Sequence, residues 1–491
     1  MRWPRFIITV FDAMRRDMIT PSLAPNLRRF LDEGCDFPNS RSVFPSVTRV
    51  NATALACGAV PAATGVIANK FFDPNIFTDK LLHTGKYDDI HAAEAAYNGR
   101  FVEAPALGEI LAKHGMKVAV VSTGSAGTTH LLNPRAADLG QVTICLSDWR
   151  ESTPAPYAQS ILDRFGPIPP AANPNLEQIR LQMRIVLEAV LPDLEPDVLM
   201  IWFSDPDSTY HKRGIGSPDS EAAIRNVDEQ FGRLLDAWRS DPAGGECQMF
   251  VMSDHGQVTT RERIEVKPAM REAGIEIGSS YTETRGVAGT TAYYGAIRIR
   301  DGEPKTLRRV ADWLNEQPWC AHVFTPAGGD GLTGLVPGTL DRTLLMVEHA
   351  RAPEVYYTMR ADAAPNQWGW AGTCFYDSSE IPLGGGTHGG LHEIEMNNLL
   401  GAQGASFRQA FSSAWPASHV DIVPTILEAL KLPAPPSVTG RVLTEALNGR
   451  AEPPAPHSHD HAVETGRHRQ VLKLWRVGGS SYVDQGFRED A

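Results

Sequence analysis

Short, continuously apolar runs that stop on an acidic residue recur along this chain. Three of them are Phe6–Phe11 before Asp12, Asp197–Phe203 before Asp207, and Phe250–Met252 before Asp254 and His255. Unbroken β-branched and aromatic runs of this length are typical of strands that are buried on both faces, as in a parallel sheet. Ligands collect outside the carboxyl ends of such strands, so these acidic residues are predicted at the functional edge of an α/β sheet.

Segments with apolar residues at helical spacing alternate with these strands. The clearest are Pro105–His114, which precedes the apolar strand Lys117–Ser122, and Leu176–Leu191, Ser220–Trp238 and Asp421–Leu430. Helices that cover a mainly parallel sheet show this alternation, so the pattern predicts an α/β core.

The pattern changes between Gln257 and about residue 385. Thr290–Ile299 alternates like a strand, Thr306–Glu316 is an amphipathic helix, and Ala321–Thr325 is again strand-like. We therefore predict a catalytic core over residues 1–257 and 386–449, with a smaller inserted α+β lid over residues 258–385. Residues 450–491 are polar and include His457-Ser-His-Asp-His461, so we expect a flexible C-terminal tail.

Composition narrows the classes of partner. The chain has 491 residues, 42% hydrophobic and 21% charged, and its net charge of −12 argues against a nucleic-acid backbone as the main partner. It has no uncharged apolar run near the roughly 18 residues of a membrane helix, so we expect no membrane partner. A homodimer stays open.

The first apolar run is too short for a signal peptide and is interpreted as the first core strand. The six cysteines show no CxxC spacing, which suits free thiols in a reducing compartment. Together these features predict a cytoplasmic protein.

The acidic residues have histidines beside them or on a Gly-rich loop. The combined set is Asp12, Asp207, His211, Asp254, His255 and His388. Six ligands of this kind suit two Zn²⁺ ions per chain, with Mn²⁺ or Fe as alternatives. Two metals about 4 Å apart form the clamp used for displacement at phosphorus. Taken one at a time, each motif has a plainer explanation, such as a helix-capping Asp254 or unrelated loop residues at Asp207 and His211.

Two further polar residues stand in informative places. Thr48 precedes a run of small residues, Asn51–Gly58, that predicts a closely packed helix, and it is either the N-cap or a nucleophile at the helix N-terminus. Asn69 is the one polar amide among apolar and aromatic residues, where a turn former is the usual explanation.

Taken in order, these motifs resemble those of the alkaline phosphatase superfamily. The matching stretches are Asp12, Phe44-Pro-Ser-Val-Thr48, Asn69-x-Phe-Phe-Asp-Pro74, Asp205-Pro-Asp207-x3-His211, Ser253-Asp254-His255-Gly256, Thr387-His388-Gly389 and Asp421-Ile-Val-Pro-Thr with Gly440-Arg-Val-Leu443. They are most similar to the type I phosphodiesterase/nucleotide pyrophosphatase group, which includes phosphonoacetate hydrolase. The resemblance spans residues 6 to about 445 and implies a three-layer α/β/α core and a covalent phosphothreonine mechanism.

The resemblance also assigns roles. It implies one Zn²⁺ bound by Asp12, Asp254, His255 and the Thr48 oxygen, and a second bound by the remaining ligands, Asp207, His211 and His388. Thr48 is then the nucleophile, and Asn69 donates a hydrogen bond to a non-bridging oxygen.

The chain departs from the family pattern at some positions. After His388 it continues Gly-Gly-Leu-His392, which makes His392 a competitor for the ligand role. A threonine nucleophile disfavours sulfate-ester hydrolysis. Phe71 and Phe72 either stack on a nucleotide base or pack in the core.

Three functions follow for comparison. The first is a two-zinc hydrolase of phosphodiester or pyrophosphate bonds in a small phosphorylated substrate. The second is a phosphonoacetate (C–P) hydrolase or phosphomonoesterase on the same site, for which Lys70, Lys113 and Lys117 are candidate carboxylate-binding residues. The third is a metal-stabilised binding protein without catalysis, against which the intact Thr48 and full ligand set argue.

Overall fold

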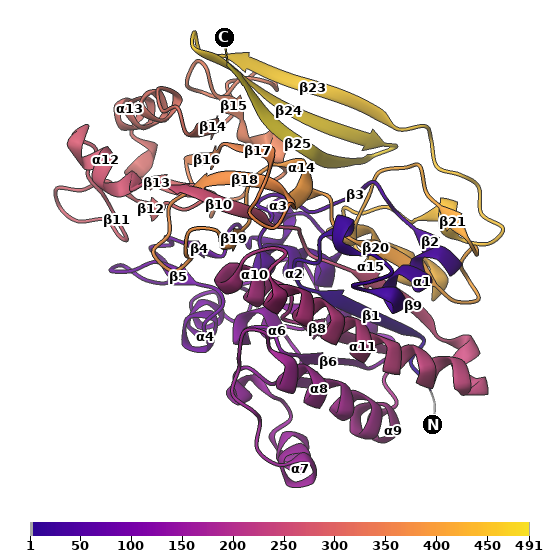
Figure 1. Ribbon diagram of the computed structural model, residues 1–491. Coiled ribbons are helices and arrows are strands. Elements are labelled where there is room, and N and C mark those ends of the chain that lie inside the picture. Colours follow the sequence, from indigo (N-terminus) through magenta and orange to yellow (C-terminus); the bar gives the residue numbers. More distant parts are fainter. Residues whose placement is uncertain (1–2, 491) are drawn as a thin grey trace.

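A central eight-stranded sheet organises the computed structural model, which describes residues 3–490 (Figure 1). The strand order is β21-β2-β20-β9-β1-β8-β6-β7, and the five strands from β9 to β7 run parallel. β20 pairs antiparallel with β9. The strand bounds are β1 Phe6–Phe11, β2 Cys35–Asp36, β6 Val118–Ser122, β7 Val142–Cys145, β8 Val198–Phe203, β9 Gln248–Met252, β20 Leu400–Gln403 and β21 Phe411–Ser412.

Helices cover both faces of this sheet, because successive side chains of a strand point to opposite faces. Ile7 and Phe11 of β1 pack in one buried cluster with α8 (Leu176–Ile185) and α11 (Pro218–Ser240). Ile8 and Val10 pack in another, with α2 (Thr48–Cys57), α5 (Leu107–Ala112) and α15 (Ile422–Ala429). The result is a three-layer α/β/α core, which confirms the predicted fold class.

The remaining elements of the core region are short. The helices are α1 Pro25–Glu33, α3 Pro61–Thr64, α4 Tyr87–Ala96, α6 Ala126–Leu132, α7 Ala155–Phe165, α9 Leu191–Leu194, α10 Asp207–Arg213 and α14 Glu393–Met396. The strands are β3 Ser40–Arg41, β4 Lys70–Phe71, β5 Leu82–His83 and β22 Ala417–Ser418, which form two small two-stranded sheets, β4 with β5 and β3 with β22.

Residues 258–385 build two sheets that are separate from the central one. The six-stranded sheet comprises β11 Ile277–Gly278, β12 Val287–Thr290, β13 Tyr294–Ile299, β14 Cys320–Thr325, β15 Leu340–Asp341 and β16 Val355–Met359. The four-stranded sheet comprises β10 Val258–Arg263, β17 Ala361–Pro365, β18 Ala371–Tyr376 and β19 Gly386–Thr387. With α12 (Val266–Glu272) and α13 (Pro304–Asn315), this region has α+β content. Its exact bounds and its role as a lid stay predictions.

The C-terminal residues form a sheet, and the predicted flexible tail is wrong for residues 457–490. β23 (His457–Glu464), β24 (His468–Val477) and β25 (Ser480–Asp490) pair antiparallel and run along the top of Figure 1. Leu472 and Val483 are buried in a cluster shared with β14 and β16. Most side chains of β23 are exposed and polar, so its sequence lacks the apolar alternation that predicts a strand. Residue 491 lies outside the described residues.

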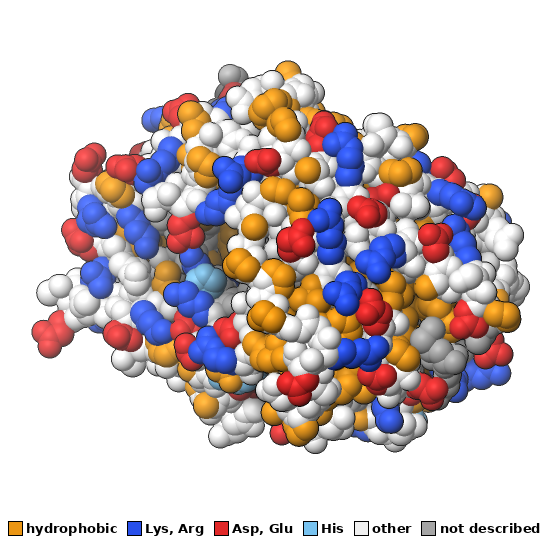
Figure 2. All heavy atoms as spheres, turned by 60° about the horizontal axis from the view of Figure 1, so that its bottom comes forward, with side chains coloured by type: hydrophobic (Ala, Val, Ile, Leu, Met, Phe, Trp, Pro, Cys, Tyr) orange, Lys and Arg blue, Asp and Glu red, His pale blue; other side chains and the backbone are white. Residues whose placement is uncertain are grey.

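The surface mixes charges of both signs. Figure 2 shows one face on which lysine, arginine and acidic side chains are interspersed around a hollow with a histidine at its edge. Among residues 3–490, no helix has the length and apolar character that a membrane span requires.

Candidate metal centre at the edge of the central sheet

The sheet register brings the predicted acidic residues together. β1 lies between β8 and β9, with Phe11 opposite Phe203 and Val10 opposite Met252, so the loops that follow these strands begin side by side. Asp12 follows β1, Asp254 follows β9, and Asp207 begins α10 just after β8. The N–H of Asp207 donates to the carbonyl of Asp12 at 3.1 Å. All three carboxylates therefore lie at one edge of the sheet.

The predicted histidines face these carboxylates. The Nε2 atoms of His211 and His388 lie 3.4 Å and 3.5 Å from Asp207 Oδ1. His255 Nε2 lies 3.1 Å from Asp254 Oδ2 and 4.0 Å from Asp12 Oδ1. Five of the six residues form two groups whose ligand atoms lie within 4.8 Å of one another: Asp207, His211 and His388, and Asp12, Asp207 and His255. Asp254 belongs to neither group and joins the cluster through its contact with His255. Asp207 belongs to both groups, whereas the sequence-based assignment gave it to one ion; that assignment stays a prediction.

The orientation of the imidazole rings suits the binding of a cation between the histidines and the carboxylates. The Nδ1 atoms of His211, His255 and His388 lie 2.7 Å, 3.0 Å and 2.9 Å from the carbonyl oxygens of Gly386, Gly256 and Ser46, respectively. A carbonyl only accepts, so each Nδ1 carries a proton, and Nε2 is the ring nitrogen that faces the carboxylates. A cation between Nε2 and the carboxylates would contact both, as in metal-bound histidine.

Two buried carboxylate oxygens support the same conclusion. Asp12 Oδ1 and Asp254 Oδ2 are buried without a hydrogen-bond partner. The other oxygens are satisfied, since Asp12 Oδ2 accepts from Trp202 Nε1 at 2.9 Å and Asp254 Oδ1 accepts two backbone N–H groups at 3.0 Å. An unsatisfied buried carboxylate oxygen costs at least about 1–3 kcal/mol, which a bound metal would remove. The donor set of the described residues therefore fits a metal centre.

The pKa shifts show how strongly these groups interact. Burial, with the nearby charges of Asp254 and Asp207, raises the pKa of Asp12 well above its ordinary value. Burial alone would also raise the pKa of Asp207, but the neighbouring His211 lowers it overall. Burial and the positive charge of His255 lower the pKa of His388. Perturbed groups that cluster in this way are typical of functional sites.

Thr48 stands beside this cluster at the first residue of α2. Its side chain is 4% exposed, and Oγ1 lies 3.3 Å from His255 Nε2. The N-cap position belongs to Val47, so Thr48 is free of the capping role that was its plainer explanation. Asn69 Oδ1 accepts the backbone N–H of Arg49 at 3.0 Å, and Asn69 lines the adjacent cavity. Both residues are therefore close to the carboxylate–histidine cluster.

Two cavities meet near Thr48. One, of about 470 Å³, is lined by Asp12, Thr48 and Asp207 together with hydroxyl and amide side chains. The other, of about 520 Å³, is lined by Asn69, Lys70, His388 and residues of the 258–385 region, including Tyr294. Cavities of this size suit a small-molecule ligand.

Some positioning residues were not predicted from the sequence. Buried Glu395 accepts the N–H groups of Gly389 and Gly390 at 2.9 Å and 3.0 Å, which holds the loop after His388. Gln257 donates from its side chain to Asp207 Oδ1. Gln257 follows the Ser-Asp-His-Gly motif directly, which is a usable signal, whereas nothing in the sequence marks Glu395.

Other candidates from the sequence lie elsewhere. His392 is the N-cap of α14, its Nδ1 accepts the N–H of Ile394 at 3.3 Å, and it belongs to neither ligand group. Phe71 and Phe72 are each 1% exposed and pack in the interior, so base stacking on them is not supported. Lys70 lines the larger cavity, whereas Lys113 and Lys117 line neither of the two cavities.

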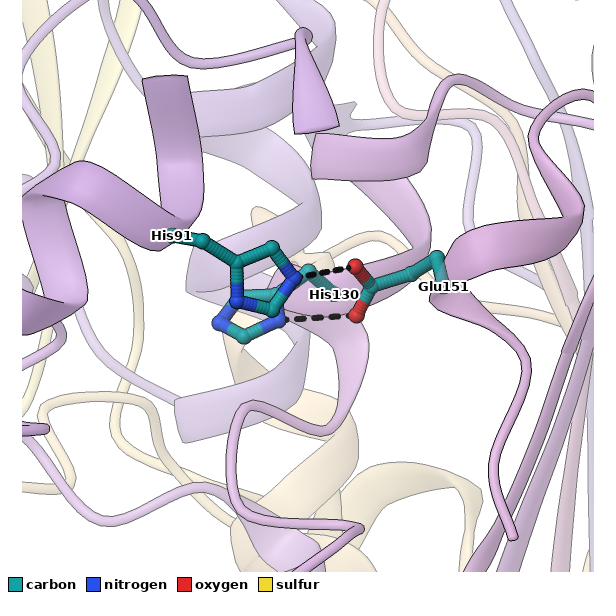
Figure 3. Close-up of side chains that lie close together, drawn as sticks. All are labelled: His91, His130 and Glu151. Atoms are coloured by element: carbon teal, nitrogen blue, oxygen red, sulfur yellow. Dashed lines mark hydrogen bonds and ion pairs between the residues drawn. The ribbon is translucent and has the colours of Figure 1, made fainter. Parts of the chain in front are cut away.

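A third histidine–carboxylate group, which we call the helical cluster, comprises His91 of α4, His130 of α6 and Glu151 (Figure 3). His91 Nε2 lies 2.8 Å from Glu151 Oε2, and His130 Nδ1 lies 2.9 Å from Glu151 Oε1. His130 Nε2 lies 3.2 Å from Glu94 Oε1. Burial would lower the pKa of His130, but its bonds to Glu151 and Glu94 raise it to about 9. This is a direct ion-pair network in which His130 is an imidazolium.

Comparison with known proteins decides the family. The model of the family described as type I phosphodiesterase / nucleotide pyrophosphatase matches residues 6–323, which is more than half of the chain. The chain belongs to this family. Hydrolysis of phosphoric esters is the chemistry of that family, and the resemblance predicted from the motifs is confirmed.

Relatives of this type I phosphodiesterase family match over limited stretches. The chain is 31% identical over 80 residues to bis(5'-adenosyl)-triphosphatase enpp4 of Xenopus laevis, covering 16% of this chain and 17% of the relative. It is 21% identical over 235 residues to venom phosphodiesterase 2 of Crotalus adamanteus, covering 48% of this chain and 24% of the relative. The matches therefore span less than a quarter of either relative's length.

Solved structures of the family share the fold. An inactive variant of murine ectonucleotide pyrophosphatase/phosphodiesterase 5 in complex with AMP superimposes with a TM-score of 0.62 at 17% identity, covering 91% of this chain and 100% of that one. The human ectonucleotide pyrophosphatase/phosphodiesterase 5 gives 0.61 with the same identity and coverage. These likenesses confirm the alkaline phosphatase-like architecture.

Proposed function

We propose that this chain hydrolyses phosphodiester or pyrophosphate bonds with two bound Zn²⁺ ions and Thr48 as a covalent nucleophile. The observation that carries the proposal is a pair of buried carboxylate oxygens, Asp12 Oδ1 and Asp254 Oδ2, that lack a hydrogen-bond partner. His255 Nε2 faces Asp254 Oδ2 and lies 3.3 Å from Thr48 Oγ1. When bound, the metals supply positive charge that lowers the pKa of the Thr48 hydroxyl and stabilises the departing oxygen.

The residues of the chain then act as follows. Thr48 Oγ1 loses its proton and forms a bond to phosphorus, while the bond from phosphorus to the leaving oxygen breaks. The side-chain amide of Asn69 donates to a non-bridging oxygen, because its own oxygen already accepts the N–H of Arg49. Water then attacks the phosphothreonine, the bond from phosphorus to Thr48 Oγ1 breaks, and the proton that the water gives up protonates Thr48 Oγ1. Glu395 and Gln257 keep the surrounding loops in position.

A nucleotide substrate is supported by the relatives, one of which is named a bis(5'-adenosyl)-triphosphatase and another of which is bound to AMP. A phosphonate or phosphomonoester is the second candidate, favoured by Arg49, which follows Thr48, lines the same cavity and forms no ion pair among residues 3–490. Both candidates use the same nucleophile and the same ligand set.

A panel of substrates tests the proposal. The zinc-loaded protein is incubated with bis(p-nitrophenyl) phosphate, p-nitrophenyl phosphate, phosphonoacetate and a dinucleoside triphosphate. We expect turnover of the diester and the triphosphate, and loss of that turnover in Thr48→Ala. Turnover of phosphonoacetate alone would favour the second candidate. Absence of turnover with every substrate would support a binding protein and contradict the proposal.

A further inference from the structure

The guanidinium of Arg49, the residue after the proposed nucleophile, makes no ion pair or hydrogen bond with the residues that the structure describes. Arg49 follows Thr48 directly, and Asn69 holds its backbone N–H. Its Nε is buried without a hydrogen-bond partner. Among residues 3–490, the structure contains neither an ion pair nor a side-chain hydrogen bond for this guanidinium. The rest of the side chain is partly exposed, so its terminal nitrogens are open to an anionic group from outside the protein.

Arg49 stands where the two cavities join. It lines the 470 Å³ cavity that contains Thr48 and Asp207, and it also lines the 520 Å³ cavity, whose lining does not include Thr48. A ligand whose phosphorus lies at Thr48 therefore extends past Arg49 into the second cavity.

A second cation lies beside Arg49. Lys70 follows Asn69 and lines the 520 Å³ cavity, and its Nζ is 3.8 Å from the nearest carboxylate oxygen, that of Glu380. Burial and the positive charges of Arg49 and Lys70 lower the pKa of His83 to about 3. Lys70 pairs with His83 across the β4–β5 sheet, and both Arg49 and Lys70 line the 520 Å³ cavity.

The other cations of this cavity have acidic neighbours. Arg263 lies 3.6 Å from Glu265, and the carboxylate of Asp377 acts on Lys267. Arg49 forms no ion pair among residues 3–490, and the carboxylates that act on its charge, Asp12, Asp207 and Asp254, are those of the candidate metal centre next to the nucleophile. An arginine fork at such a place matches the planar oxygens of a carboxylate or phosphoryl group.

We propose that Arg49, assisted by Lys70, binds a second anionic group of the substrate, distinct from the phosphorus that Thr48 attacks. This inference rests on the proposed function, because it takes Thr48 as the place of the reacting phosphorus. The substrate class is a small molecule with a carboxylate or a further phosphoryl group a few bonds from that phosphorus. Neutral alkyl and aryl esters lack this contact.

Binding to a catalytically silent protein tests the proposal. Zinc-loaded Thr48→Ala protein is titrated calorimetrically with two matched pairs of probes, pyrophosphate against inorganic phosphate and phosphonoacetate against methylphosphonate. In each pair only the first probe carries a second anionic group. We expect Arg49→Gln to reduce the preference for that probe by about 10- to 100-fold in at least one pair, the size of a charge-assisted hydrogen bond. The pair that responds identifies the second group as phosphoryl or carboxylate.

Matched variants separate this contact from general charge loss. Arg263→Gln removes the same charge from the same cavity and is expected to change the preference by less than about twofold, since Arg263 has Glu265 as a neighbour. Arg49→Lys should retain part of the preference, and thermal unfolding checks that each variant is folded.

Three results would overturn the proposal. Arg49→Gln could weaken the binding of both probes in a pair equally, which would place Arg49 on the transferred phosphoryl group. The other two are an unchanged preference in Arg49→Gln and the absence of any preference in the parent Thr48→Ala protein. Because no turnover is measured, this test is independent of the substrate panel. Loss of turnover in that panel with an intact binding preference would contradict only the proposed function.

Discussion

Two histidine–carboxylate clusters in the same molecule are built from similar residues and differ in how those residues meet. In the helical cluster, Glu151 contacts His91 and His130 at 2.8 Å and 2.9 Å, and each contact is a direct hydrogen bond. At the sheet edge the corresponding distances are 3.1–3.5 Å, and the carboxylate oxygens Asp12 Oδ1 and Asp254 Oδ2 have no hydrogen-bond partner.

The difference lies in where the second ring nitrogen is used. At the sheet edge each histidine gives Nδ1–H to a backbone carbonyl, which leaves only Nε2 to face the carboxylates. In the helical cluster both nitrogens of His130 face carboxylates, so a proton is the shared cation. Residue type alone therefore does not mark a metal site; the hydrogen bonds behind the ligands do.

Removing the nucleophile gives the largest expected effect. Thr48→Ala should lower kcat on the order of 10⁴-fold or more while zinc content stays near two per chain, because the reacting oxygen is lost but the other ligands remain. Rates and metal analysis on the same sample measure both quantities. Thr48→Ser keeps a hydroxyl and should stay active, and His91→Ala should change kcat by less than about twofold. Full activity in Thr48→Ala would contradict the assignment.

Metal content provides the next test of the comparison. Asp207→Ala should lose at least one of about two zinc ions per chain, because Asp207 faces both groups of ligands. Glu151→Ala is the matched change in the helical cluster and should leave zinc content unaltered. Elemental analysis after dialysis measures the zinc content. Equal loss of zinc in the two variants would contradict the conclusion that only the sheet-edge cluster binds metal.

The helical cluster should instead contribute to stability in a pH-dependent way. The pKa of His130 is raised from 6.5 to about 9, so its contribution is complete below about pH 6.5 and is lost as the pH rises through about 9. At pH 6, His130→Gln should lower the free energy of unfolding by about 3 kcal/mol, since two carboxylates lose their cation. Urea unfolding at pH 6, 8 and 9.5 should show the difference shrinking.

The partly exposed His91 provides a control, and His91→Gln should lower the free energy of unfolding by less than about 1 kcal/mol. A pH-independent difference between the wild type and His130→Gln would rule out the imidazolium assignment for His130.

The smallest expected effect concerns Trp202, which donates a hydrogen bond to the proposed metal ligand Asp12. Trp202→Phe removes the N–H that donates to Asp12 Oδ2 and should weaken zinc binding by about 10- to 100-fold. Competition with a chelator measures this affinity. Glu94→Gln removes the corresponding partner of His130 in the helical cluster and should leave the affinity for zinc unchanged; a similar loss there would mean that both clusters bind metal.

Patterns of short range made most of this architecture predictable. The apolar run Phe6–Phe11 coincides with β1, and the acidic residues after three strands converge because those strands are adjacent and parallel. The strand β23 could not be foreseen, because its exposed, polar side chains follow no apolar alternation. Contacts between residues distant in the chain, such as Trp202 with Asp12, leave no signal in a single sequence.

The sequence also does not reveal which of the two proposed metal ions each ligand would bind. Motifs named six residues that lie together in the structure, but which carboxylate faces which histidine depends on side-chain directions at the sheet edge. Asp207 contacts both His211 and His388 and also lies in the group of His255, which the spacing of four residues between Asp207 and His211 does not reveal.

Anomalous diffraction at the zinc absorption edge, from crystals soaked in zinc, tests the central claim most directly. The account predicts two peaks among Asp12, Asp207, Asp254 and the three histidines, one of them in contact with Thr48 Oγ1, and no peak between His91, His130 and Glu151. Peaks at the helical cluster with the sheet edge empty would contradict it.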